Sequence, residues 1–135
     1  MIVNLLNSAT GVKSFAILQL LYKNGFLGKN TLLIIDEPEV HLHPQWIVEY
    51  ARIIVLLNKE IGVKFFIGSH NPDMIGAIKY IAEKEKVDDN LNFYIAEDKE
   101  KKLKYTYRSL GTDIEDIFKS FNIAIDRINL YGATE

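Results

Sequence analysis

Two adjacent carboxylates follow an apolar run near the middle of the chain. The run Thr31-Leu-Leu-Ile-Ile35 leads directly into Asp36 and Glu37, which we call the acid pair. A continuous apolar run of this length predicts a strand that is covered on both faces. Because neighbouring residues on an extended chain point to opposite sides, the two acids would face different targets. Asp36 suits a hydrated Mg²⁺, and Glu37 suits a water molecule that it activates as a general base. The alternative is that Asp36 only ends the strand and Glu37 is solvated.

An imidazole follows the next apolar run. Residues 63–68 predict a second strand, and Ser69 and His70 come directly after it. The carboxyl ends of neighbouring parallel strands meet at the same edge of a sheet, so we expect His70 to approach the acid pair. There it would hydrogen-bond a phosphate oxygen or hold a catalytic water. The alternative is that Ser69 or Asn71 only caps the helix that follows.

The elements between and after these strands must place the acid pair and His70 together. Pro44 suits a first helical position, apolar residues then recur at helical spacing, and Gly62 ends the helix. A second helix begins at Pro72, with Asn71 as its cap. Strand, helix, strand and helix with short connections predict parallel pairing through a right-handed crossover.

The flanking segments predict further elements. We expect a helix over 13–23. Strands are expected over 92–96 and 103–108, joined by an exposed charged tip at 97–102. A further helix is expected after the capping-box spacing from Thr112 to Glu115. The fold class is therefore α/β, a partial sheet with a parallel βαβ core, a C-terminal β-hairpin and a terminal helix. We expect a single domain over 1–135, with one part over 1–90 and another over 91–135.

The composition excludes several classes of protein. The chain has 135 residues, a formal net charge of −2 and no cysteine. It therefore has no disulfide framework, no thiolate metal site and no global field that attracts nucleic acid. No apolar run reaches the roughly 18 residues of a membrane span. The N-terminus lacks the charged segment followed by an apolar segment that is typical of a signal peptide. We expect a cytoplasmic protein with no membrane partner.

The order of these motifs resembles the second half of an ABC-type ATPase head, in the branch of SMC-, RecF- and OLD-like ATPases and AAA domains of anti-phage systems. The resemblance covers about residues 7–100. It implies a P-loop NTPase-like fold in which Leu32–Asp36 is the Walker B strand, Asp36 orients Mg²⁺ and Glu37 polarises the attacking water. His70 matches the switch histidine that contacts the γ-phosphate. The D-loop-like segment after the acid pair, with Glu39, His41 and His43, would touch a partner subunit.

The N-terminal segment is similar to the signature loop of the same family. Ser8, Thr10, Gly11 and Lys13 would contact ATP that is held by the opposite subunit, although Ala9 and Thr10 depart from the usual Ser-Gly pattern. A helix N-terminus suits such an anion. The alternative is a plain helix cap with a glycine turn.

A phosphate-binding P-loop is absent from this sequence. Gly11-Val12-Lys13-Ser14 is not its end, because Gly, Lys and Ser must be contiguous and an earlier Gly is required. We therefore expect a C-terminal half that lacks the N-terminal Walker A lobe and is inactive as an ATPase by itself. The resemblance implies that the missing Walker A strand lies beside the strand that ends at His70, which would leave an exposed edge at 63–68. We expect the 92–97 strand to lie beside this edge, or two chains to pair over the apolar surface.

Two rival interpretations remain open. One is a metal-dependent hydrolase that uses the three histidines with neighbouring acids, although its His-x-His pair is weak. More simply, His41 and His43 pack or hydrogen-bond around this loop and the start of the helix at Pro44. The other is a non-catalytic oligomerisation or regulatory module with an ATPase-like fold.

In the complete ATPase the resemblance implies Mg²⁺ with ATP, no tightly held transition metal, and a homo-oligomer that sandwiches ATP. It also admits DNA or a nuclease as a partner.

Overall fold

The computed structural model describes residues 10–98 and 103–132 of the chain. The chain divides into two compact units between Val87 and Asp88, and the described residues of each unit are treated separately. The expectation of a single domain with a change near residue 90 stays a prediction. Within the described residues, no helix is both long enough and apolar enough to cross a membrane.

The first unit contains the predicted parallel βαβ core. Its elements in chain order are α1 (Thr10–Lys23), β1 (Leu32–Asp36), α2 (Pro44–Ile61), β2 (Lys64–Gly68) and α3 (Pro72–Glu85). β1 and β2 pair in parallel, and the register places Asp36 opposite Gly68. The two strand ends that carry the acid pair and His70 therefore lie at one edge, as the sequence predicted.

Local sequence explains where α2 begins and ends. Pro44 occupies the first turn, and the Nδ1 atom of His43 accepts a hydrogen bond from the backbone N–H of Gln45 at 3.4 Å. At the other end Gly62 takes a left-handed conformation with φ of 83°, which closes the helix. The N-cap of α3 is Asn71, whose Oδ1 atom accepts from two backbone N–H groups. The sequence predicted the start of both helices.

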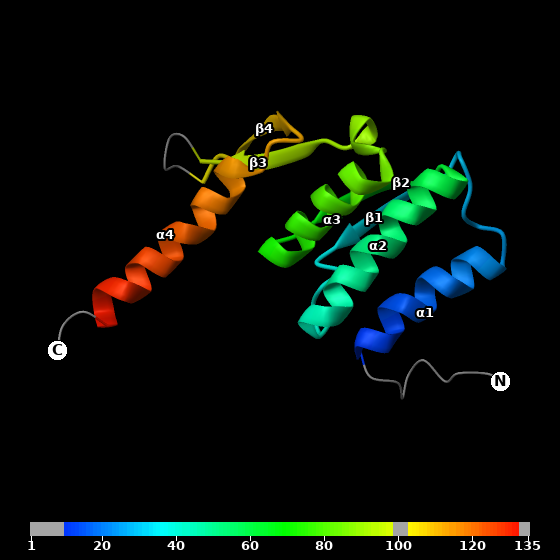
Figure 1. Cartoon of the computed structure of the whole chain (residues 1–135), viewed down its shortest axis with the longest axis horizontal. Coiled ribbons are helices and arrows are strands. Elements are labelled where there is room, and N and C mark those ends of the chain that lie inside the picture. Colours follow the sequence, from blue (N-terminus) through cyan, green and yellow to red (C-terminus); the bar gives the residue numbers. More distant parts are fainter. Residues whose placement is uncertain (1–9, 99–102, 133–135) are drawn as a thin grey trace. The chain divides into compact units, whose positions relative to one another are not determined.

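The core of the first unit lies between the helices and one face of the sheet. α2 and α3 lie side by side against β1 and β2 (Figure 1). The buried apolar side chains of α2 and α3 are Ile47, Tyr50, Ala51, Ile54, Val55, Met74, Ile75, Ile78 and Ala82. Val63, directly before β2, is fully buried. Burial of this surface is the main stabilising contribution to the unit.

The other face of the sheet is bare. Leu32 is 56% exposed, Ile34 is 73% exposed and Phe66 is 61% exposed, while the residues between them are half-buried. The prediction that β1 is covered on both faces is therefore wrong for the described residues. The physical reason is that α2 and α3 pack on the same side, so alternate apolar side chains of each strand point to solvent. We call Leu32, Ile34 and Phe66 the bare sheet face.

The second unit contains the predicted hairpin and terminal helix. Its elements are a short 3₁₀ turn (Asp88–Asn90), β3 (Phe93–Glu97), β4 (Thr106–Gly111) and α4 (Glu115–Gly132). β3 and β4 are antiparallel and form their own two-stranded sheet. Within the described residues β3 pairs with β4 and no pairing of β3 with β2 is present. The expectation that the 92–97 strand lies beside the edge at 63–68, or that two chains pair over it, stays a prediction. β4 also begins three residues later than predicted, and residues 99–102 of the predicted tip lie outside the described residues.

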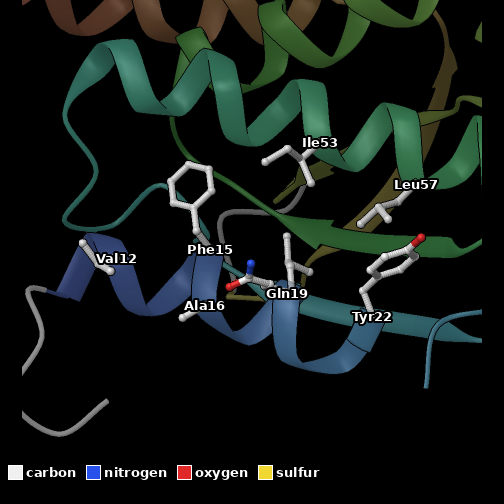
Figure 2. A pocket seen from close by; sticks show the side chains of 8 residues that line it. Val12, Phe15, Ala16, Gln19, Tyr22, Ile53 and Leu57 are labelled. Atoms are coloured by element: carbon white, nitrogen blue, oxygen red, sulfur yellow. The ribbon is translucent and has the colours of Figure 1, made fainter. Parts of the chain in front are cut away.

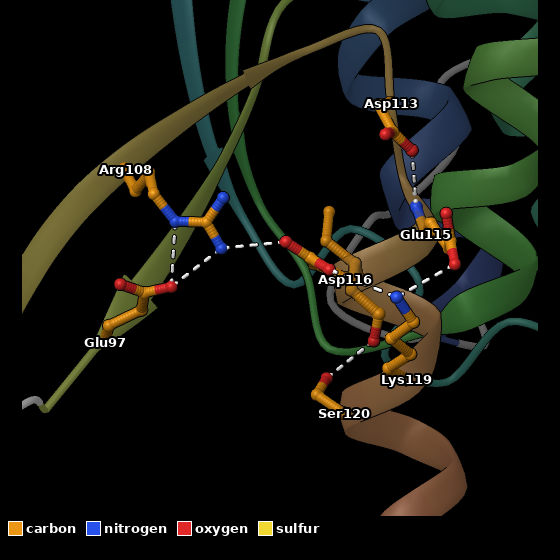
Figure 3. Close-up of polar contacts among 8 residues, drawn as sticks. Glu97, Arg108, Asp113, Glu115, Asp116, Lys119 and Ser120 are labelled. Carbon is orange, nitrogen blue, oxygen red and sulfur yellow. Dashed lines mark hydrogen bonds and ion pairs between the residues drawn. The ribbon is translucent and has the colours of Figure 1, made fainter.

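Ion pairs join the hairpin to α4 within the second unit (Figure 3). The Arg108 guanidinium donates to Glu97 Oε1 and to Asp116 Oδ2, each at 2.9 Å. The hydrogen bond from Arg108 lowers the pKa of Asp116. Asp113 Oδ1 accepts from the backbone N–H of Glu115 at 2.9 Å and satisfies an N–H at the start of α4. Because these side chains remain partly exposed to solvent, the ion pairs contribute little to stability, and their main effect is to orient the hairpin and α4.

Alanine at Gly62 is expected to destabilise the protein by about 1–2 kcal/mol, because the left-handed conformation is unfavourable for any residue with a Cβ. The added Cβ would also meet the Cγ atom of Lys29 at 3.2 Å. Gly28→Ala is the matched control, since a Cβ there meets nothing within 4 Å. Urea unfolding measures both variants, and equal stability of the two would contradict this account of the end of α2.

The buried tyrosine of α2 predicts a second measurable property. Tyr50 packs edge-on against Phe15, with ring centroids 5.2 Å apart, and desolvation raises its pKa to about 12. An unfolded tyrosine ionises near pH 10, so burial of Tyr50 stabilises the fold fully below about pH 10, and this stabilisation is lost as the pH rises towards 12. Absorbance titration of the native protein and of Tyr50→Phe should differ by one phenolate that appears near pH 12. A difference centred near pH 10, with the fold intact by circular dichroism, would contradict the assignment.

Candidate functional site

The acid pair and His70 meet at the carboxyl ends of β1 and β2. The backbone N–H of Glu37 donates to the Gly68 carbonyl at 2.8 Å, which extends the ladder one residue beyond β1. Glu37 then turns the chain with a positive φ of 45°. Its Oε1 atom lies 3.4 Å from Nε2 of His70. The Glu37 side chain is 44% exposed and that of His70 is 88% exposed, so both can reach a ligand from solvent.

Asp36 lies beside the same strand end but faces a different neighbour. Its partner in the register is Gly68, and a Cβ at that position would lie 2.7 Å from Asp36 Oδ1. The absence of a side chain at Gly68 therefore leaves the space that the Asp36 carboxylate occupies. Asp36 is exposed. In the part of the chain that the structure describes, no group of three or more His, Cys, Asp or Glu side chains is arranged to hold a metal ion.

A third carboxylate, which is buried, links the segments that follow the two strands. Glu39 is only 8% exposed, and its Oε1 atom accepts from the Ser69 hydroxyl at 2.6 Å and from the His70 backbone N–H at 3.3 Å. We placed Glu39 in the D-loop-like segment from the sequence but did not predict this link. Its partners are 30 and 31 residues away, so no local spacing could have indicated it.

The segment between Glu37 and α2, residues 38–43, forms a tight turn that we call the connecting turn. Backbone hydrogen bonds run from Val40 N–H to the Glu37 carbonyl and from Leu42 N–H to the Glu39 carbonyl, and His41 has a positive φ of 71°. His41 and His43 are exposed. His43 caps α2, which confirms the expectation that it hydrogen-bonds at the start of that helix. Contact of this turn with a partner subunit stays a prediction.

The start of α1 lies against the connecting turn. A Cβ on Gly11 would meet the His41 carbonyl oxygen at 3.0 Å and Leu42 Cδ2 at 3.2 Å, so the backbone approaches closely where only glycine fits easily. α1 begins at Thr10 rather than at Lys13, which places Thr10, Gly11 and Lys13 in its first turn. Ser8 lies outside the described residues. The nucleotide contacts of these four residues stay a prediction.

A separate apolar pocket lies between α1 and α2 (Figure 2). It has a volume of about 490 Å³ and is lined by Val12, Phe15, Ala16, Leu18, Gln19, Tyr22, Ile53 and Leu57. This lining contains no carboxylate and no imidazole. The pocket is therefore a packing feature of α1 on α2 rather than a site with acid or base groups.

The fold and the site define a class of protein, and comparison with known proteins supplies its family. A parallel βαβ unit with an acid pair at the end of one strand and a histidine after the next fits a fragment of a P-loop NTPase-like fold. Residues 5–75, just over half of the chain, match the family described as "AAA domain, putative AbiEii toxin, Type IV TA system". The chain belongs to this family of AAA domains.

One curated relative extends the comparison. The chain is 33% identical over 91 residues to the Old nuclease of Escherichia phage P2. The aligned region covers 67% of this chain and 14% of that protein, so the chain spans about one seventh of the relative's length.

Alanine at Gly68 is expected to move the Asp36 carboxylate without unfolding the protein. The new Cβ would approach Oδ1 to 2.7 Å, and the carboxylate can rotate away because it is exposed. We expect a change in stability of about 1 kcal/mol, the usual size for a single substitution, with a clear shift of the Asp36 carboxyl resonance in the ¹³C spectrum. A Gly68→Ala protein that keeps this resonance unchanged would contradict the described geometry.

Proposed function

We propose that this chain supplies the catalytic acid pair and the switch histidine of an ATPase. The observation that carries the proposal is the 3.4 Å approach of His70 Nε2 to Glu37 Oε1 at the ends of two parallel strands. Open α/β sheets bind their ligands at this edge. Membership in the AAA-domain family and similarity to the Old nuclease support a nucleotide as that ligand.

The three side chains would divide the chemistry of ATP hydrolysis. Asp36 would hold Mg²⁺ through water, which fits an exposed carboxylate with few neighbours, since Mg²⁺ uses one or two carboxylates and keeps several waters. The Mg²⁺ would neutralise charge on the phosphate oxygens of ATP. Glu37 would accept the proton of the attacking water as general base. His70, next to Glu37, would donate a hydrogen bond to the γ-phosphate.

A second lobe with the phosphate-binding loop would complete the site. The bare sheet face supports this part of the proposal, because three large apolar side chains on one face of a parallel sheet are normally covered. β1 and β2 form a sheet of two strands within the described residues, so β2 also has a free edge for another strand. We propose that the Walker A lobe pairs there and covers Leu32, Ile34 and Phe66.

The complete site would form between two subunits. The close approach of Gly11 to the His41 carbonyl supports this arrangement, because it joins the start of α1 to the exposed connecting turn as one surface. Ser8, Thr10, Gly11 and Lys13 would contact ATP bound by the partner, and the connecting turn would touch the partner subunit. DNA or a nuclease domain is the proposed partner of such an ATPase, in keeping with the name of the similar phage protein.

A non-catalytic oligomerisation module is the second candidate function. The same bare sheet face favours it, since an apolar surface can pair two chains without nucleotide. The two candidate functions differ in the role of the acid pair, which is catalytic in the ATPase and not catalytic in the oligomerisation module.

Glu37→Gln is the decisive variant for the ATPase proposal. In the assembled ATPase we expect turnover to fall at least 100-fold, because losing a general base typically costs about 10²-fold or more. ATP binding and subunit pairing should be retained, since the amide has the same shape as the carboxylate. Phosphate release, nucleotide titration and sedimentation measure the three properties.

Glu60→Gln is the matched control, because Glu60 is an exposed residue near the end of α2 and away from the strand ends. Turnover of Glu37→Gln within about threefold of the unmodified protein would exclude Glu37 as the base and favour the oligomerisation module.

A further inference from the structure

A buried carboxylate joins the two loops that carry the proposed catalytic groups. Glu39 Oε1 accepts from the Ser69 hydroxyl and from the His70 backbone N–H, while Glu39 Oε2 is buried without a hydrogen-bond partner among the described residues. We infer that Glu39 is a positioning residue that fixes His70 relative to Glu37. The inference rests on the proposed ATPase function.

The direction of each hydrogen bond is determined by its neighbours. Ser69 Oγ accepts from the backbone N–H of Asn71 at 3.1 Å, so its own proton is free to be donated to Glu39 at 2.6 Å. Asn71 in turn caps α3 through its side chain. The first turn of α3, the His70 loop and the connecting turn are thus joined through one carboxylate oxygen.

Burial of this carboxylate is unfavourable for stability. A carboxylate removed from water needs partners at both oxygens, and here only one oxygen has them. An apolar side chain of similar size would avoid that cost. The position of Glu39, two residues after Glu37 and in contact with the residue before the proposed switch histidine, indicates a role in the site instead.

Geometry explains how Glu39 acts without touching a ligand. It holds the backbone N–H of His70, and the imidazole of the same residue then lies 3.4 Å from Glu37. The connecting turn that carries Glu39 directly follows Glu37, where the backbone is in a left-handed conformation. Glu39 therefore constrains both members of the Glu37–His70 pair through the main chain. Small displacements of such groups lower the rate more than they lower substrate affinity.

The link itself is tested by amide hydrogen exchange in the 135-residue chain without nucleotide. We expect the His70 N–H to exchange about tenfold faster in Glu39→Ala, the effect of losing one hydrogen bond. Glu39→Gln should restore most of the protection because its amide oxygen can still accept. Ser69→Ala removes the hydroxyl that donates to Glu39 and should leave the His70 N–H protected. Unchanged exchange of His70 in Glu39→Ala would overturn the inference, whatever Glu37→Gln does to turnover.

The role in positioning is tested by kinetics in the assembled ATPase. Glu39→Ala should lower kcat by about 10- to 100-fold with KM for ATP within about threefold, and Glu39→Gln should recover most of kcat. The control is Asn58→Ala, which loses the hydrogen bond from Asn58 Nδ2 to the Val63 carbonyl at 2.9 Å, away from the strand ends. It should lower stability and leave kcat unchanged.

The two experiments separate the possible failures. If Asn58→Ala lowers kcat as much as Glu39→Ala at equal loss of stability, Glu39 is only structural and the inference is wrong. If Glu37→Gln keeps its turnover, the ATPase proposal fails, and the exchange experiment still decides whether Glu39 holds His70.

Discussion

The parallel pairing of β1 with β2 is the constraint on which the rest of the site depends. It places Asp36 opposite Gly68 and brings the next residues of both strands to one edge. Because side chains alternate along a strand, a register shift of one residue would turn Asp36 to the opposite face and separate Glu37 from His70. The N–H of Glu37 is bonded to the Gly68 carbonyl, so the ladder continues to the residue that begins the turn.

Stability and function make opposing demands on this small unit. α2 and α3 bury one face of the sheet, while Leu32, Ile34 and Phe66 on the other face stay in contact with solvent. Glu39 adds a buried carboxylate, one oxygen of which has no hydrogen-bond partner among the described residues. Both features are unfavourable for a unit that acts alone, and both are accounted for if the chain works against another lobe and if Glu39 orders the strand ends.

The sequence predicted the helices and strands better than it predicted which of their faces are covered and which distant side chains meet. Pro44, Gly62 and Asn71 each have a local conformational reason to begin or end a helix, so the limits of α2 and the start of α3 were predictable. The exposure of Ile34 was not, since an apolar run looks the same whether one face or both are covered. The link from Glu39 to Ser69 was also beyond prediction, because it joins residues 30 positions apart through side-chain geometry alone.

The most direct test of the central claim is paramagnetic relaxation by Mn²⁺ in place of Mg²⁺ in the complex of the assembled ATPase with ATP. If the two strand ends form the nucleotide site, the resonances of Asp36, Glu37 and His70 broaden first when Mn²⁺ and ATP are added together. Side chains of the α1–α2 pocket, such as Leu57, should keep sharp lines. Broadening that spares the strand ends and is centred on another surface would contradict the claim.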